Sequence, residues 1–151
     1  MERACRILEE SDISHVLCVT DIENVNASNV VSRPAFVSGD HYPLQSTVKW
    51  LLRHIDCTGY KYLVTLMPSC PMITPQDVRD GLKMLKDNKL NIVRSYGKDG
   101  DENGLLIADI DYYMSHWMDV YPGALRARGK EIHTEEEFLS AKAVIKKGKY
   151  Q

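Results

Sequence analysis

The stretch Lys61–Pro71, KYLVTLMPSCP, says most about the fold of this chain. Its first half, Tyr62–Met67, is a near-continuous apolar run, which is typical of a central parallel strand covered on both faces. Pro68 and Pro71 then end the strand, because proline fixes the backbone and cannot donate to a neighbouring strand. Open α/β sheets bind ligands in loops at this end of a strand. A stiff strand-to-helix connection without a ligand has the same pattern, and the strand and loop alone favour it.

Length and composition indicate a single domain over residues 1–151. Apolar residues make up 44% of the chain, which is ample for a core, and the net charge of −2 gives no argument for nucleic acid or for an anionic membrane. No apolar run is long enough to span a bilayer, and the charged N-terminus has no signal-peptide core. The four cysteines are far apart, which favours free thiols in a reducing compartment and hence a cytoplasmic protein.

Along the chain, segments with strand patterns alternate with segments of helical spacing. This alternation predicts a three-layer α/β/α sandwich with a mostly parallel sheet. The Gly- and Asp-rich turn at 97–104 adds one antiparallel hairpin. Thr74 with Asp77 and Thr134 with Glu137 have the pattern of capping boxes and predict the starts of two helices. The last helix is expected to pack Phe138, Ala141 and Ile145 inward. The predicted strands are 15–20, 30–32, 61–67, 90–96 and 105–110, and the predicted helices are 2–11, 43–56, 75–88, 111–120 and the segment from Thr134.

Common catalytic signatures are missing from the sequence, including the phosphate-binding P-loop, the dinucleotide-binding glycine motif and the nucleophile elbow. No Ser or Cys lies close in sequence to His and Asp, although catalytic triads need not be local. The segment Asp99–Gly104 begins like a calcium-binding loop. The position that needs a bidentate Glu is Ile110, however, so a solvated hairpin turn is the better interpretation.

Polar residues at the ends of predicted strands are the first candidates for a site. Asp21 follows the strand at 15–20, at an edge where a ligand site can form, or it caps its own turn. Arg33 can contact a base or a phosphate, or simply be solvated. Glu131 and His133 lie two residues apart on an extended segment, so their side chains point to the same face. They can hold a divalent metal, but spacing alone favours ordinary surface residues.

Taken in order, these segments resemble the cytidylyltransferases that activate acidic sugars, the CMP-sialic acid synthetase family. The family has a strand ending in Ser-Thr-Asp, and Val19–Asp21 stands in that place. Its Arg-Pro pair is matched by Arg33–Pro34, and its later Ala-x-Asp by the Gly39–Asp40 pair. Its Leu-Gln-Pro-Thr-Ser-Pro-Leu loop is matched by Leu66–Met72.

The second half of the chain continues the resemblance in the same order. The family's Thr-x-x-Asp-Ile helix start is similar to Thr74–Val78, and its Asn-Gly-x-Ile-Tyr strand to Asn103–Ile107. Its final Ile-Asp-Ile-Asp-Thr-x-x-Asp-Phe is similar to Lys130–Phe138. Each motif is short, and it is their order over nearly the whole chain that carries the resemblance.

The resemblance implies a fold of the nucleotide-diphospho-sugar transferase type and an N-acylneuraminate cytidylyltransferase activity, the transfer of CMP from CTP to a sugar acid. It implies CTP, CMP or a nucleotide sugar as ligand, and Mg²⁺ or another divalent metal as cofactor. The implied metal ligands are Glu131 and His133. The implied nucleotide-binding residues are Asp21, Arg33, Asp40, Pro68, Ser69, Asn103 and Gly104.

Several departures from the family pattern indicate a truncated and degenerate member. The family's first strand and its phosphate loop with Gly, Arg and Lys have no counterpart here, although phosphate binding needs converging N–H groups and cations. The family's loop Gln is Met67, and its paired magnesium aspartates correspond to Glu131 and His133. An imidazole suits a softer metal than Mg²⁺, or none. The family's long insertion before Asn-Gly is reduced to a turn.

Three functional hypotheses follow from the sequence. The first is a cytidylyltransferase-like chain that is weak or inactive alone and retains at most binding of a nucleotide or nucleotide sugar. The second is an active enzyme completed in trans, in which a partner chain or a homo-oligomer supplies the missing strand and phosphate loop. The third is a non-catalytic scaffold or a partner of a full-length synthetase. The sequence assigns no catalytic residue.

Overall fold

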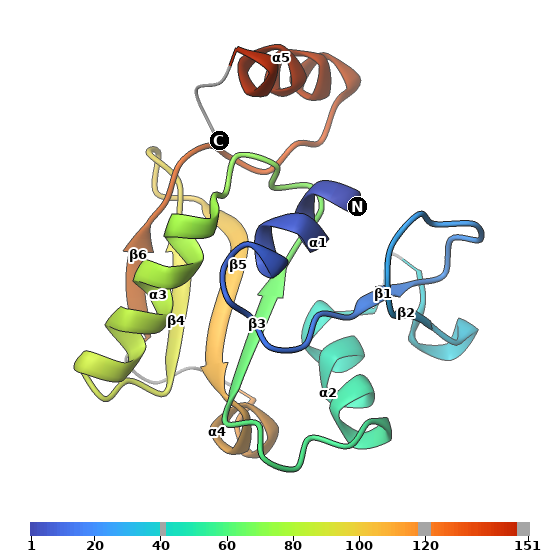
Figure 1. Ribbon diagram of the computed structural model, residues 1–151, viewed down its shortest axis with the longest axis vertical. Helices are drawn as coiled ribbons and strands as arrows, with labels where there is room; N and C mark the ends of the chain where they lie inside the picture. The colour runs from blue at the N-terminus through green and yellow to red at the C-terminus, as the bar shows by residue number, and fades with distance from the viewer. Residues whose placement is uncertain (40–41, 118–121, 148–151) are drawn as a thin grey trace.

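The computed structural model describes residues 1–39, 42–117 and 122–147. Helices and strands alternate along the chain, which confirms a mixed α/β protein (Figure 1). The helices are α1 (Glu2–Glu9), α2 (Leu44–His54), α3 (Pro75–Asp87), α4 (Ile110–Ser115) and α5 (Glu135–Lys146), with a short 3₁₀ turn η1 (Ala35–Val37). The strands are β1 (Cys18–Thr20), β2 (Val30–Ser32), β3 (Tyr62–Leu66), β4 (Ile92–Tyr96), β5 (Glu102–Asp109) and β6 (Gly123–Arg126).

The main sheet has the strand order β3-β5-β4-β6. Strand β5 runs antiparallel to both β3 and β4, whereas β4 and β6 are parallel. Three of the four strands therefore point in one direction, and β5 alone is reversed between them. The hairpin predicted around the Gly- and Asp-rich turn is confirmed as the β4–β5 pair.

The expected central position of the Tyr62–Leu66 strand is wrong. Strand β3 lies at one end of the four-stranded sheet and pairs only with β5 there. All five of its residues are half-buried rather than buried. The longest strand, β5, takes a central position instead, because it pairs along both of its edges.

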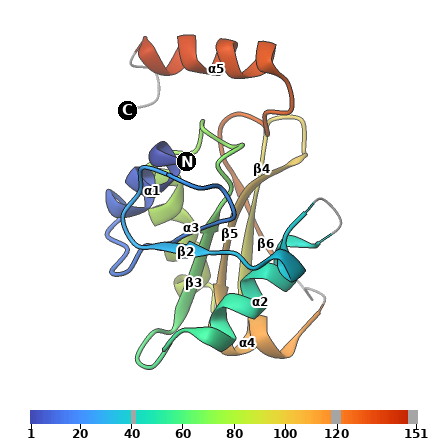
Figure 2. The same cartoon turned by 90° about the vertical axis from the view of Figure 1, so that its right-hand side faces the viewer.

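Strands β1 and β2 form a separate parallel pair, in which Cys18, Val19 and Thr20 lie opposite Val30, Val31 and Ser32. We refer to this pair, its connection and the adjoining Arg33, residues 18–33, as the ribbon. Figures 1 and 2 show it to one side of the main sheet, beyond β3. The ribbon carries Asp21 and Arg33 at or just beyond the carboxyl ends of its two strands.

Apolar clusters lie on both faces of the main sheet. One joins Ile7 of α1 and Val78 and Leu85 of α3 to Ile107 of β5. The other joins helices α2 and α4 to the opposite face, through Val48, Tyr113, Ile92 and Ala108. Figure 2 shows the sheet between these two sets of helices.

Capping boxes begin two of the helices, as the sequence predicts. Thr74 exchanges hydrogen bonds with Asp77 at the start of α3, and Thr134 does the same with Glu137 at the start of α5. Helix α5 nevertheless stands away from the sheet in Figure 1. Ala141 is its one buried residue, and Phe138, which was expected to pack inward, is 52% exposed.

Among the described residues, no helix combines the length and the apolar character needed to cross a bilayer.

Candidate functional site

The loop that follows β3 is held against the segment that precedes α5. The Ser69 hydroxyl donates to Glu131 Oε1 at 2.8 Å, and the backbone N–H of Ile132 donates to the Ser69 carbonyl at 2.8 Å. Pro68 and Pro71 flank this contact and stiffen the loop. The structure therefore brings Glu131 to Ser69 of the Pro68–Pro71 loop, although the two residues are 62 positions apart in sequence.

Glu131 and His133 share one face, as their alternation predicts. His133 Nε2 lies 3.8 Å from Glu131 Oε2, and the side chains are 69% and 29% exposed respectively. No group of three or more His, Cys, Asp and Glu side chains suited to a metal ion is found in the part of the chain that the structure describes. Mg²⁺ prefers an octahedral set of oxygen ligands. One carboxylate already bonded to Ser69, beside one imidazole, fits that preference poorly.

Cys70 belongs to the same loop, next to Ser69, and is 2% exposed. Burial raises the pKa of the Cys70 thiol to about 11. At neutral pH this residue is therefore a protonated thiol, which is a poor nucleophile and a poor metal ligand. The loop offers a hydroxyl, a carboxylate and an imidazole, but no activated sulfur.

Asn103 and Gly104 lie at the start of β5, beside the same loop. Asn103 is 1% exposed, and its Oδ1 accepts a hydrogen bond from Ser95. Its Nδ2 is buried and has no acceptor among the described residues. The Gly104 carbonyl accepts from the Met67 N–H at 3.0 Å, so Gly104 ties the start of the loop to the sheet. A ligand would reach the buried Asn103 amide only if its surroundings moved.

Asp21 and Arg33 form the second group of candidate residues. Arg33 Nη2 donates to Asp21 Oδ2 at 2.9 Å, and the Arg33 N–H donates to the Thr20 carbonyl at 2.8 Å. The hydrogen bond from Arg33 is the main cause that lowers the pKa of Asp21. Arg33 Nε is buried and finds no acceptor within the described chain. The remaining candidate, Asp40, lies outside the described residues.

The two groups come from different parts of the molecule. Asp21 and Arg33 are carried by the ribbon, whereas Ser69 and Glu131 lie where the main sheet meets the segment leading to α5 (Figures 1 and 2). The order of the motifs in the sequence suggested one combined site, whereas the structure places these candidate residues in two separate clusters.

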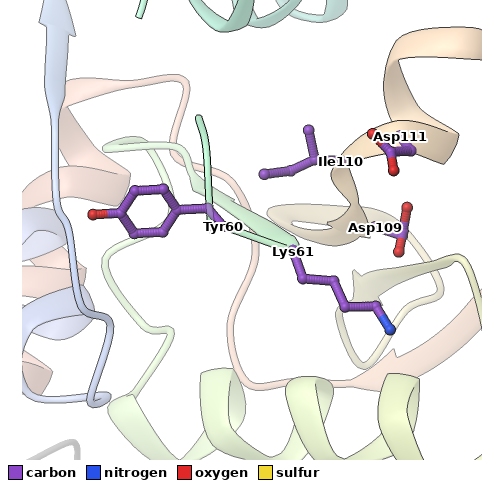
Figure 3. A pocket seen from close by; sticks show the side chains of 6 residues that line it. Tyr60, Lys61, Asp109, Ile110 and Asp111 are labelled. Atoms are coloured by element: carbon purple, nitrogen blue, oxygen red, sulfur yellow. The ribbon is translucent and has the colours of Figure 1, made fainter. Parts of the chain in front are cut away.

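A surface hollow lies at the other end of β3. It is a shallow pocket of about 350 Å³ that opens at the amino end of β3 and the carboxyl end of β5. Figure 3 shows Lys61 beside Asp109 in this pocket. The Asp109 carboxylate already accepts the Tyr112 N–H at 3.1 Å, which caps α4. The pocket is lined by the Lys61 amine and by two carboxylates, Asp109, which already caps α4, and Asp111, and this set assigns it no chemistry.

Sequence reasoning missed a buried lysine on α2. Lys49 is 2% exposed, and its Nζ donates to the His116 carbonyl at 2.6 Å and lies 4.1 Å from the centre of the Trp117 ring. The sequence carries little signal of this burial, because Lys49 lies about 200° around the helix from Leu51 and therefore off its apolar face.

A scan against models of known protein families finds none that matches this chain, and a search of curated proteins finds no match either.

Proposed function

We propose that the chain is a cytidylyltransferase-like domain, of the three-layer nucleotide-diphospho-sugar transferase type, that binds a cytidine nucleotide or nucleotide sugar and turns over little or no CTP alone. This proposal rests on the burial and the hydrogen bonding of Arg33. Its side chain is 26% exposed and its guanidinium bonds to Asp21, while the buried Nε has no acceptor among the described residues. A buried donor without an acceptor costs stability, so a ligand carbonyl or phosphate oxygen placed there would be stabilised.

The proposed lack of turnover follows from the electrostatics of phosphoryl-type transfer. Such reactions depend on cations and N–H groups that converge on the developing negative charge. At the loop after β3, the described groups include the Ser69 hydroxyl, the Glu131 carboxylate, the His133 imidazole and the Arg3 guanidinium, whose Nε already donates to the Pro71 carbonyl. A carboxylate next to a triphosphate would repel it, and Arg3 is the one permanent cation of this set. The set is therefore suited to holding a neutral or hydroxylated group rather than to activating CTP.

The test is a thermal-shift titration with CTP, CMP and, as the control base, UMP. A ligand that binds only the folded protein raises its stability by about 2.7 kcal/mol at a concentration of 100 Kd. We expect a cytidine-selective rise in melting temperature that Arg33→Gln abolishes. Arg6→Gln is the matched control, because Arg6 is a well-exposed arginine on α1. Equal shifts in wild type and Arg33→Gln would contradict the proposed site, and pyrophosphate release by the chain alone would contradict the proposed inactivity.

The open edge of β3 favours a second candidate, an enzyme completed in trans by another strand. Met67 donates to Gly104, and Lys61 accepts from Ile110, each at 3.0 Å. Because bonding alternates along an antiparallel pair, odd-numbered residues bond to β5. Tyr62, Val64 and Leu66 then direct their N–H and C=O groups to the other edge, which has no paired strand in the described sheet. Such an edge is a template for an added strand.

This second candidate is tested by adding a polypeptide that carries the first strand and phosphate loop of an acidic-sugar cytidylyltransferase. Pyrophosphate release from CTP is expected only in the mixture. Val64→Pro removes an outward N–H without touching the β5 ladder and should abolish that release, whereas Val64→Ala keeps the N–H and should retain it. A mixture without activity, or one whose activity Val64→Pro leaves unchanged, removes this candidate.

A further inference from the structure

Helix α5 is covered along one side only. Ala141 is buried, and Glu137 and Val144 on the same side are half-buried. Phe138 and Leu139 are 52% and 55% exposed, and Figures 1 and 2 show the helix apart from the main sheet. A single exposed apolar residue is ordinary, but two large ones side by side on an outlying helix form an apolar patch that water covers poorly.

Charged side chains of opposite sign flank this apolar pair. Glu135 lies three and four residues before Phe138 and Leu139, and Lys142 lies four and three residues after them, so the four residues share one helix face. We refer to these four residues as the outer face of α5. Glu135 and Lys142 are both exposed, and Lys142 Nζ lies 5.8 Å from the centre of the Phe138 ring. From its amino end, the outer face therefore presents a carboxylate, two apolar side chains and an amine.

A second α5 that runs antiparallel to the first complements this order. With a twofold axis between Phe138 and Leu139, the Phe138 of one copy lies opposite the Leu139 of the other. Glu135 then lies opposite Lys142, because these two residues are equally far from the axis along the helix. Twofold symmetry forms each of these pairs twice. A parallel pair would instead place each charge opposite its own copy, where like charges repel.

We propose that the outer face of α5 is a docking surface for a second copy of this chain, which binds by antiparallel pairing of the two α5 helices in this register. The 12-residue helix is about 18 Å long. A contact between two such helices is small beside the roughly 1,200–2,000 Å² of a stable interface. The dimer is therefore weak, and it forms at high protein concentration.

This surface goes beyond the proposed nucleotide binding and does not depend on it. Arg33 belongs to the ribbon and the open sheet edge belongs to β3, whereas the docking surface belongs to α5. The helix cap is also separate from it. Glu137 accepts from the Thr134 N–H and pairs with Lys130, and it lies on the covered side of the helix. Substitutions on the outer face therefore leave the capping box in place.

The experiment is sedimentation velocity of the full chain from about 10 μM to about 1 mM, at low ionic strength so that surface charges are little screened. We expect a dimer fraction that grows with concentration. Leu139→Ser should raise the dissociation constant about tenfold or more, with little change in melting temperature, because the side chain is exposed in the monomer. Glu135→Lys should raise it about fivefold, since two attractive pairs become repulsive.

A charge exchange tests the register. Glu135→Lys/Lys142→Glu reverses both partners and should restore a dissociation constant near that of the wild type. Glu136→Lys is the matched control, because it makes the same charge change in the same helical turn but lies outside the outer face, and it should dimerise as the wild type does.

Three results would overturn the proposal. One is a monomer at every concentration, which would leave the outer face to another occupant. Another is a dimer that Leu139→Ser does not weaken, which would place the contact elsewhere. The third is a double variant that dimerises no better than Glu135→Lys, or a Glu136→Lys control that is weakened as much, because either would show that Glu135 and Lys142 do not face each other.

Discussion

Gly104 shows how a single residue holds the loop after β3 in place. Its φ of +75° lies in the left-handed region, and a Cβ placed there would lie 2.6 Å from Cys70 Sγ and 2.9 Å from Met67 Cβ. The residue was selected from the sequence as a ligand contact. The structure gives it a second, packing role, because no side chain fits between β5 and this loop.

We expect Gly104→Ala to destabilise the protein by about 2–4 kcal/mol, from backbone strain together with overpacking. Gly100→Ala is the matched control, since Gly100 also has a positive φ, +90°, but nothing lies within 4 Å of its Cβ position. That control should cost about 1 kcal/mol, from strain alone. Urea denaturation measures both, and equal losses would show that the contact with Cys70 and Met67 is unimportant.

Helix α5 depends on its first turn more than on packing. Glu137 accepts from the backbone N–H groups of His133 and Thr134 and also pairs with Lys130. The hydrogen bond from Lys130, followed by that from His133, lowers the pKa of Glu137 from its ordinary 4.5 to about 2. Ala141 is the one buried residue of this helix, so packing stabilises the helix little and the cap contributes a large share of its stability.

A carboxylate with a depressed pKa binds fewer protons in the folded state than in the unfolded state. Its stabilisation is therefore present above pH 4.5 and is lost as pH falls towards 2. We expect the helical amide shifts of residues 135–146, followed by NMR, to decay over this range in the wild type. Glu137→Gln does not titrate and should remove this transition. An identical pH profile in both proteins would show that α5 is held by something else.

At the scale of elements, the sequence predicts most of the secondary structure because its signals are local. The capping boxes at Thr74 and Thr134 and the Gly- and Asp-rich turn before Asn103 each act within a few residues, and all three are found. The inward position of Phe138 was wrong, because helical spacing identifies an apolar face but not whether the fold covers it. Whether Glu131 and Ser69 meet depends on a contact 62 residues apart, which no local pattern encodes.

The whole molecule consists of a main sheet with helices on both faces and a ribbon beside it. The body is held by two apolar clusters, and its central strands β4 and β5 supply Val93, Ile107 and Ala108, each at most 1% exposed. The ribbon has three-residue strands, and each of them is paired on one edge only. These two parts should differ in local stability.

Native-state hydrogen exchange should resolve this difference. We expect the amides of Val93 and Ile107 to exchange slowest, at rates set by global unfolding, and those of Val19 and Val31 to exchange at least ten times faster through local opening. Equal protection of ribbon and sheet would show that the molecule opens as one unit.

At this scale the sequence alone was least informative. It predicted the α/β class from the alternation of elements, yet it placed the Tyr62–Leu66 strand at the centre of the sheet. Strand neighbours are set by long-range pairing: β3 pairs with residues 105–109, and the whole of β4 lies between them in sequence. An apolar run such as Tyr62–Leu66 shows that a strand is partly buried, not which strands flank it.

The pairing order of the sheet also has a kinetic consequence. Strands β4 and β5 are joined by a turn of five residues, so they can meet within microseconds, which is the usual time for a hairpin. Strand β3 must then find β5 across a loop of about 40 residues, and closing such a loop costs entropy before any contact is gained. The hairpin is thus the natural nucleus for folding, with α3 packing on it. The edge of β3 remains open after the rest of the sheet has formed.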